Sequence, residues 1–371
     1  MRSLFLLFIL PCFSVYASKS IDYIYLEYPN NSYFSWITGS QAIHIIEVDP
    51  TAFDIKPVKA LDNGLGRESV LSIAERHGAV ASINGGFFTI GGTFDGKACG
   101  TLKIHDWVAL PFKPRGCIGW SADNPMPILD RLLADVSIAY NQTEIPVDGL
   151  NRPRKNGEVV VYTPSFHRST LTKPDGEEIV VINGLVDSIV HGGSAKIPEN
   201  GFIVSIQNTH PLFRTFNIGE KLALSTNVYP LEGLTTADDW HQSDYIVGGT
   251  PLLFHEKTDK IDYIQEKTIK TFLTNRHART AVGILPNGHL LFVVVDRTSL
   301  FDGMTMYELK ELMIELGCVA ALNLDGGGSS TMVFNGNIVN TPHGDENENQ
   351  GEKAVRRVSD AIIVCPKHPK I

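Results

Sequence analysis

Residues 321–334 read ALNLDGGGSSTMVF, an apolar run followed directly by an aspartate, three glycines and two serines. Glycine weakens regular strands, so three in a row indicate a turn that only glycine tolerates, or a close approach of the backbone to another group. A nucleotide P-loop would need a lysine and a helix after the glycines, whereas TMVFNGNIVN predicts a hairpin around Asn335 and Gly336. Two interpretations remain: a structural turn capped by Asp325, or a turn whose amides and hydroxyls face an anionic or hydroxyl-rich ligand.

The segments before this turn favour the second interpretation. TAVGIL and LLFVVV flank residues 286–289, a turn-rich connection typical of an antiparallel hairpin. LLFVVV is followed by a predicted helix over 305–316 and then by CVAALNL, which is the order of a β-α-β crossover between parallel strands. This topology gathers Arg279, Asp296 and Asp325 at one edge of a sheet, about 5 to 10 Å apart.

Extended patterns dominate the rest of the chain. Short runs rich in Val and Ile, bounded by Gly, Pro and Asn, predict strands over 42–48, 79–84, 158–163, 178–184 and 202–206. Helical patterns are limited to Ser69 to His77 and to Thr305 to Leu316. The fold class we predict is α+β, with a β-rich mixed sheet and a few flanking helices. A strand-rich N-terminal region, 18–78, packs in this prediction against a main domain over 79–365.

The first 17 residues resemble a secretory signal. MRSLFLLFILPCFSVYA has one charge, an apolar stretch from Leu4 to Val15 and small residues before a polar start, which predicts cleavage after Ala17. The apolar stretch is shorter than the roughly 20 residues that span a bilayer. We therefore expect a secreted or periplasmic protein with no integral membrane segment after cleavage.

The net charge of the chain argues against two classes of binding partner. The 371 residues carry a net charge of -9, which argues against a general nucleic-acid or anionic-membrane surface. The local basic cluster Arg152-Pro-Arg154-Lys155 is expected to be a solvated loop.

Four cysteines remain after removal of the signal. An even number in an exported chain permits disulfides in three pairings. We favour Cys99 with Cys117 and Cys318 with Cys365, because each pair bounds a strand-rich segment.

Seven motifs in order resemble the phosphodiester glycosidase domain family. They are Ile83–Phe88, Ile197–Ser205, Val247–Pro251, Arg279–Gly283, Phe292–Asp296, Gly303–Thr305 and Leu322–Ser330. Residues 356–362 resemble the closing strand of that domain. The family usually has glycine after the aspartate of its Val-Val-Val-Asp strand, and Arg297 at that position bears on the choice of substrate.

The resemblance implies hydrolysis of a sugar-1-phosphodiester, of the N-acetylglucosamine type, in a glycan or surface polysaccharide. It implies Asn84, Arg279, Asp325 and Ser329 as functional positions, which overlap with the cluster expected from topology. We predict Asp325, Asp296 and Arg279 as the catalytic residues. The substrate-binding residues that we predict are Asn84, Gly85, Gly249, Thr280, Gly326, Gly327, Ser329, Ser330 and Arg357.

Glycosidases commonly use two carboxylates, so we expect Asp325 to act as nucleophile or base and Asp296 as its partner or as a structural acid. Arg279 would clamp the phosphate, and Asn84 and Ser329 would donate hydrogen bonds. His277 is a candidate proton donor, although a solvated loop histidine is the more common case.

Two other functions fit the same sequence. No cofactor is implied with certainty, but a divalent cation held by Asp296 and Asp325 would make the protein a phosphodiesterase. A glycan-binding envelope protein without turnover is the other alternative.

Overall fold

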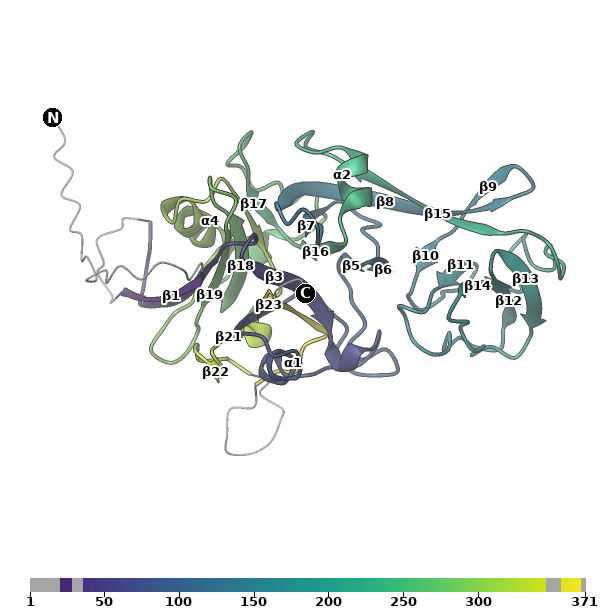
Figure 1. Ribbon diagram of the computed structural model, residues 1–371, viewed down its shortest axis with the longest axis horizontal. Coiled ribbons are helices and arrows are strands. Elements are labelled where there is room, and N and C mark those ends of the chain that lie inside the picture. The colour runs from purple at the N-terminus through teal and green to yellow at the C-terminus, as the bar shows by residue number, and fades with distance from the viewer. Residues whose placement is uncertain (1–20, 29–35, 345–354, 368–371) are drawn as a thin grey trace.

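The computed structural model describes residues 21–28, 36–344 and 355–367. The predicted signal peptide at residues 1–17 lies outside these ranges. Within them the chain folds into four β-sheets with few helices (Figure 1), which confirms a β-rich fold. None of the helices in the described part is long and apolar enough to cross a membrane.

The first sheet contains the strands that lead into the glycine-rich turn. Its strands, in spatial order, are β1 (Ile21–Tyr28), β2 (Gln41–Val48), β19 (Leu290–Val295), β18 (Arg279–Ile284), β20 (Ala320–Asn323) and β17 (Leu252–Phe254). β18 pairs antiparallel with both β19 and β20, so β19 and β20 run parallel on either side of it. The predicted hairpin and crossover are therefore confirmed.

A second sheet supplies the strands that face this turn. It contains β22 (Asn337–Ile338), β21 (Met332–Phe334), β4 (Ala81–Asn84), β23 (Asp360–Pro366) and β3 (Phe53–Lys59). β21 and β22 form the hairpin predicted around Asn335 and Gly336. The N-terminal region shares its strands between sheets, since β2 pairs with β19 and β3 pairs with β23.

The third sheet connects two bodies of the molecule. Its strands are β15 (Ala223–Pro230), β8 (Ile128–Tyr140), β7 (Arg115–Trp120), β16 (Tyr245–Gly249), β5 (Leu102–Ile104) and β6 (Asp106–Ala109), with β9 (Thr143–Pro146) paired to β8. In Figure 1 the long strands β8 and β15 extend from the body that holds β16–β20 toward the body that holds β10–β14. That second body contains the fourth sheet, made of β10 (Gly149–Leu150), β11 (Val159–Tyr162), β14 (Gly201–Gln207), β12 (Gly176–Ile182) and β13 (Leu185–Val190).

Four helices flank these sheets in the described ranges. They are α1 (Val70–Arg76), α2 (Ala237–Gln242), α3 (Lys270–Thr274) and α4 (Met306–Glu315). The two helices predicted from periodicity are α1 and α4, and α4 begins at a capping box between Thr305 and Glu308. The short helices α2 and α3 were not predicted, because five or six residues are too few to establish a period of 3.6.

Apolar side chains from three sheets form the main core. Ile46 and Phe292 of the first sheet, Ile83 of the second and Ile118 and Val247 of the third are all fully buried in one cluster. This packing holds the carboxyl ends of β4 and β20 against each other, because both strands belong to sheets that share the core.

All four described cysteines are free thiols, so the two predicted disulfides are wrong. Cys99 is exposed, whereas Cys117 is buried in β7 within the core between the third and fourth sheets. Cys318 packs in the core under α4, and Cys365 lies beside the separate core under α1. Each predicted pair bounds a strand-rich segment of the sequence, but its two cysteines pack in different places in the structure.

Candidate active site

The strand order brings the ends of β18, β19 and β20 to one edge of the first sheet. Arg279 is opposite Val295, so Asp296 follows directly at that edge. The backbone continues to pair beyond β20, since the N–H of Leu324 donates to the carbonyl of Thr280 at 2.9 Å and that of Gly327 to Ala278 at 2.8 Å. Asp325 therefore lies at the same edge, as the topology predicted.

Asn84, at the end of β4, links the second sheet to this edge of the first sheet through hydrogen bonds. Its Nδ2 donates to the carbonyl of Asp325 at 2.8 Å, while its Oδ1 accepts from the Thr280 hydroxyl at 2.8 Å and from the N–H of Thr331 at 3.2 Å. The N–H of Asp325 in turn donates to the carbonyl of Gly85 at 3.2 Å. Asn84 is fully buried and its amide is occupied by these bonds, so the structure assigns it to holding Asp325 rather than to donating to a substrate.

Asp325 keeps part of its surface accessible at the entrance of the turn. The N–H of Gly326 donates to its Oδ1 at 3.0 Å. Burial raises the pKa of Asp325 to about 6, against the lowering effects of the Ser329 hydroxyl, the Arg356 charge and the Gly326 N–H. A carboxyl group with this pKa is mostly ionised at neutral pH and still exchanges protons near it, which suits a nucleophile or a general base.

A second carboxylate, Asp360, lies next to Asp325 and was not among the predicted site residues. It begins β23 and is 2% exposed. Its Oδ1 accepts from the N–H of Gly86 at 2.9 Å, and Ser359 donates its hydroxyl to Oδ2. Burial raises the pKa of Asp360 to about 6, and its charge raises the pKa of Asp325 further. The sequence signal was its place in residues 356–362, which carried the resemblance to a closing strand.

Gly85 allows this second carboxylate to approach the turn. A Cβ atom at Gly85 would lie 1.9 Å from Asp360 Oδ1, which no side chain could tolerate. Gly85 is buried, so it shapes the site without being open to a ligand.

Arg356, rather than the predicted Arg357, belongs to the glycine-rich turn. Arg357 is exposed. The Arg356 Nη1 donates to Ser329 Oγ at 3.4 Å, and a Cβ atom at Gly328 would come within 2.4 Å of the Arg356 guanidinium carbon. The guanidinium thus lies flat against the turn, where its charge lowers the pKa of Asp325. Two adjacent arginines cannot be distinguished by sequence when the strand that orients them starts only at Asp360.

Arg279 lies under the turn with 1% of its surface exposed. Its Nε donates to the carbonyl of Met304 at 2.8 Å and its Nη2 to the carbonyls of Asn275 at 2.6 Å and Phe272 at 3.3 Å. Its guanidinium also lies over the Phe272 ring at 5.5 Å, and burial lowers its pKa to about 10. This placement differs from the expected phosphate clamp, because backbone carbonyls occupy the guanidinium and protein covers it.

Several basic groups lie around this edge. The pKa of His277 is lowered by burial and by the charges of Arg279, Arg297 and His343. Arg297 and His343 are exposed, and His277 is half-buried. Arg356 is the cation whose charge acts on Asp325, so an anionic substrate bound there would face its guanidinium.

Asp296 is enclosed by donors from two segments, β2 and residues 340–341. Its carboxylate is 3.2 Å from His44 Nε2 of β2, and it accepts from Asn340 Nδ2 at 3.0 Å and from the N–H of Thr341 at 2.9 Å. Asn340 Nδ2 also donates to the carbonyl of Ser330 at 3.1 Å. Asp296 therefore supports the glycine-rich turn through Asn340. The sequence did not indicate His44 or Asn340, which lie far from Asp296 along the chain.

The remaining predicted site residues differ in how deeply they are buried. Thr280 and Ser330 are fully buried and joined by a 3.1 Å hydrogen bond between their hydroxyls, and Ser329 is also buried. Gly249 permits a close backbone approach, since a Cβ atom there would lie 2.1 Å from the carbonyl oxygen of Asn323. Gly326 and Gly327 are partly accessible, and Gly327 adopts a left-handed φ of +61° that favours glycine.

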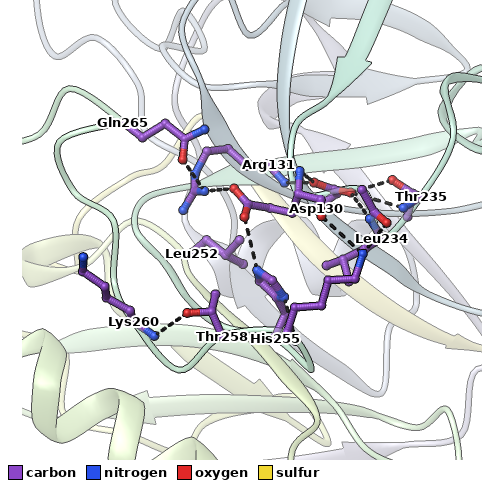
Figure 2. Close-up of polar contacts among 12 residues, drawn as sticks. Asp130, Arg131, Leu234, Thr235, Leu252, His255, Thr258, Lys260 and Gln265 are labelled. Carbon is purple, nitrogen blue, oxygen red and sulfur yellow. Dashed lines mark hydrogen bonds and ion pairs between the residues drawn. The ribbon is translucent and has the colours of Figure 1, made fainter.

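A buried ion-pair network holds the loop that follows Gly249. Arg131 Nε is 3.2 Å from Glu266 Oε1, and Glu266 accepts from the N–H of Leu252 at 2.9 Å and from the Thr250 hydroxyl at 2.5 Å. Figure 2 shows Arg131 directed toward Gln265, while its neighbour Asp130 points to Leu234 and Thr235. Thr250 accepts from Asn323 Nδ2 at 2.7 Å, so this network reaches the end of β20 two residues before Asp325.

No group of three or more His, Cys, Asp or Glu side chains is arranged to hold a metal ion within residues 21–28, 36–344 and 355–367. The divalent cation therefore stays a prediction, and its proposed ligand Asp296 is already hydrogen-bonded as described above.

Comparisons with known proteins agree with the motifs. The family model described as phosphodiester glycosidase matches residues 176–365, just over half of the chain. The bovine N-acetylglucosamine-1-phosphodiester alpha-N-acetylglucosaminidase is 36% identical over 110 residues, which cover 28% of this chain and only 20% of the bovine protein.

Two solved structures share the fold. A hypothetical protein from Synechocystis has a TM-score of 0.77 at 21% identity, over 93% of this chain and 62% of that one. The catalytic domain of the zebrafish N-acetylglucosamine-1-phosphodiester alpha-N-acetylglucosaminidase, auto-inhibited by its pro-peptide, has a TM-score of 0.50 at 17% identity, over 95% of this chain and 85% of that one.

Proposed function

The chain belongs to the phosphodiester glycosidase family, and on this premise we propose that it hydrolyses the bond between a sugar and phosphate in a sugar-1-phosphodiester. The bovine relative is named for N-acetylglucosamine, so an N-acetylglucosamine-1-phosphodiester is the first substrate to test. The single observation that carries the proposal is Asp325, a partly accessible carboxylate with a pKa of about 6 on which the charge of Arg356 acts.

Asp325 acts on the anomeric carbon in this mechanism, either directly or through a water molecule. The bond between the anomeric carbon and the phosphate oxygen breaks, and its electron pair stays on the leaving phosphate monoester. Arg356 faces this developing charge from the glycine-rich turn, which lowers the barrier most where the charge is largest. Water supplies the hydroxyl of the released sugar and a proton for Asp325 or the phosphate.

The buried residues support Asp325 without touching the substrate. Asn84 and Thr280 fix its backbone, and Asp296 supports the turn through Asn340. Arg279 holds the carbonyls of Asn275 and Met304 beneath the site. Such supporting contacts maintain the sub-ångström placement that catalysis needs.

The first experiment is to incubate the purified protein with a methyl alpha-N-acetylglucosamine-1-phosphodiester and to follow free N-acetylglucosamine by mass spectrometry. The protein should release the sugar, and Asp325→Asn should reduce turnover by about 10³-fold or more, since it removes a group that takes part in bond breaking. Turnover unchanged in Asp325→Asn would refute the role of this residue.

The same reaction run in H₂¹⁸O separates the glycosidase from the phosphodiesterase. Cleavage at the anomeric carbon places ¹⁸O in the sugar, whereas attack at phosphorus places it in the phosphate. A label found only in phosphate would favour the cation-assisted alternative, and tight binding without any product would favour a glycan-binding protein.

Export is part of the proposal and rests on residues 1–17. Fractionation of expressing cells, with N-terminal sequencing of the product, should find the mature protein outside the cytoplasm and beginning at Ser18. A cytoplasmic product that retains residue 1 would contradict it.

A further inference from the structure

A basic groove adjoins the candidate active site. It is a cavity of about 330 Å³ between the β5–β7 region and the loop before β11. Its charged lining residues are Lys97, Lys113, Arg115, Arg152 and Lys155, with one carboxylate, Asp148. The cluster Arg152–Lys155, which was expected from sequence to be a solvated loop, thus lines a cavity together with Lys97, Lys113 and Arg115. These cations gather in one place although the net charge of the protein is -9.

The acidic groups near the groove are fewer than its cations. Arg152 is paired with Glu158 at 2.6 Å, and Asp148 Oδ2 accepts from the N–H of Val159 at 2.8 Å. In the described part of the chain Lys97, Lys113 and Arg115 form no ion pair, although Arg115 donates to the backbone carbonyls of Pro114 and Glu266. The charge of Lys155 acts on Glu158 and lowers its pKa, so Glu158 is shared between Arg152 and Lys155. Positive charges that converge without neutralisation repel each other and attract a polyanion.

The groove is connected to the candidate site through one turn. The N–H of Cys99, in the groove wall, donates to the carbonyl of Phe87 at 2.7 Å. Gly86, one residue earlier, donates to Asp360 at 2.9 Å. On its other side the Phe87 ring is 6.3 Å from that of Phe272, over which Arg279 lies. The turn 85–87 therefore contacts Asp325 and Asp360 through Gly85 and Gly86, and the wall of the basic groove through Phe87.

We propose that the basic groove binds the aglycone side of the substrate, and that this aglycone is a polyanion in which sugar units are joined by successive phosphodiesters. The inference rests on the proposed function for the position of the cleaved bond. A volume of this size holds one or two sugar-phosphate units, and the neighbouring units of such a polymer would place a phosphate in the groove while another occupies the site beside Asp325.

The test compares two substrates and two double variants. The substrates are methyl alpha-N-acetylglucosamine-1-phosphodiester and an oligomer of three or more N-acetylglucosamine-1-phosphate units. Lys113→Gln with Lys155→Gln removes two exposed groove cations. Lys173→Gln with Lys221→Gln removes two exposed cations outside the groove and gives the same change in net charge.

The readout is the ratio of kcat/KM for the oligomer to that for the methyl ester. The wild type should prefer the oligomer, and 0.5 M salt should weaken this preference. The groove variant should lower the ratio by roughly tenfold, as two exposed charge contacts imply, whereas the control variant keeps the wild-type ratio. A wild type with no preference, or equal ratios for the two double variants, would overturn the proposal.

Calorimetric titration with the same oligomer separates this proposal from the proposed function. If neither substrate is hydrolysed, the proposed function fails, and binding still decides the groove. Oligomer binding that weakens in the groove variant but not in the control variant supports the basic groove as a polyanion site. Absence of binding, or equal binding by both variants, refutes it.

Discussion

Replacement of Asp360 by asparagine should change the free energy of unfolding in a pH-dependent way. The free energy of unfolding of the variant minus that of the wild type should be larger at neutral pH than at acidic pH. Asp360 is almost fully buried, and its pKa is raised by burial from 3.8 to about 6. The folded state therefore binds a proton more tightly than the unfolded chain does. Below the unfolded pKa the buried carboxyl costs nothing; the cost grows as the pH rises from the unfolded pKa toward the folded pKa, and it is complete above the folded pKa.

The size of this effect follows from the two pKa values. One pKa unit corresponds to about 1.4 kcal/mol, so the full cost of ionising Asp360 in the folded state is about 3 kcal/mol at pH 7.5 and only about 1 kcal/mol at pH 4.5. Asparagine keeps an oxygen that can accept from the N–H of Gly86. Any change in packing acts equally at both pH values, so the difference of about 2 kcal/mol isolates the ionisation.

The assay is urea unfolding of the wild type and Asp360→Asn at pH 4.5 and pH 7.5, with Asp123→Asn at an exposed position as the control. The free energy of unfolding of Asp360→Asn, relative to the wild type, should rise by about 2 kcal/mol from pH 4.5 to pH 7.5. Equal differences at the two pH values would refute a raised pKa at Asp360. A second readout is the acid limb of the kcat/KM profile, which should move to lower pH because the Asp360 charge raises the pKa of Asp325.

Three further predictions test the surroundings of Asp325. Asn84→Ala should lower the free energy of unfolding by about 3 kcal/mol, measured in urea, because three internal hydrogen bonds are lost from a buried side chain; a loss of activity at unchanged stability would instead indicate contact with substrate. Gly328→Ala should raise KM by roughly tenfold with little change in thermal stability, since the new Cβ displaces the flexible guanidinium of Arg356 and one charge-assisted contact is worth about 1.5 kcal/mol; an unchanged KM would contradict a phosphate contact by Arg356. Iodoacetamide should modify exposed Cys99 in the native protein but leave Cys117, whose pKa is raised to about 12 by burial, as peptide mapping will show; protection of Cys99 that only a reductant removes would indicate a disulfide.

The sequence by itself determined the strands that bear the turn and the edge where its functional groups meet. β18, β19 and α4 have long periodic patterns, and the short connection between β18 and β19 leaves an antiparallel hairpin as its simplest solution, so Arg279, Asp296 and Asp325 could be placed together without coordinates. The glycines of the turn and the ordered motifs also identified the family. These features are local, or follow from the fixed geometry of adjacent strands.

Only the tertiary structure decided which groups are accessible and how they are charged. Arg279 and Asn84 are covered and bonded internally. Asp360, at the start of the last strand, and Arg356, just before that strand, reach the turn more than 30 positions after Asp325. The shared core of the sheets creates these contacts, and it also raises the pKa values of both aspartates through burial. Sequence patterns specify which face of a strand is apolar, but the packing of several sheets determines which polar ends meet and how much water remains between them.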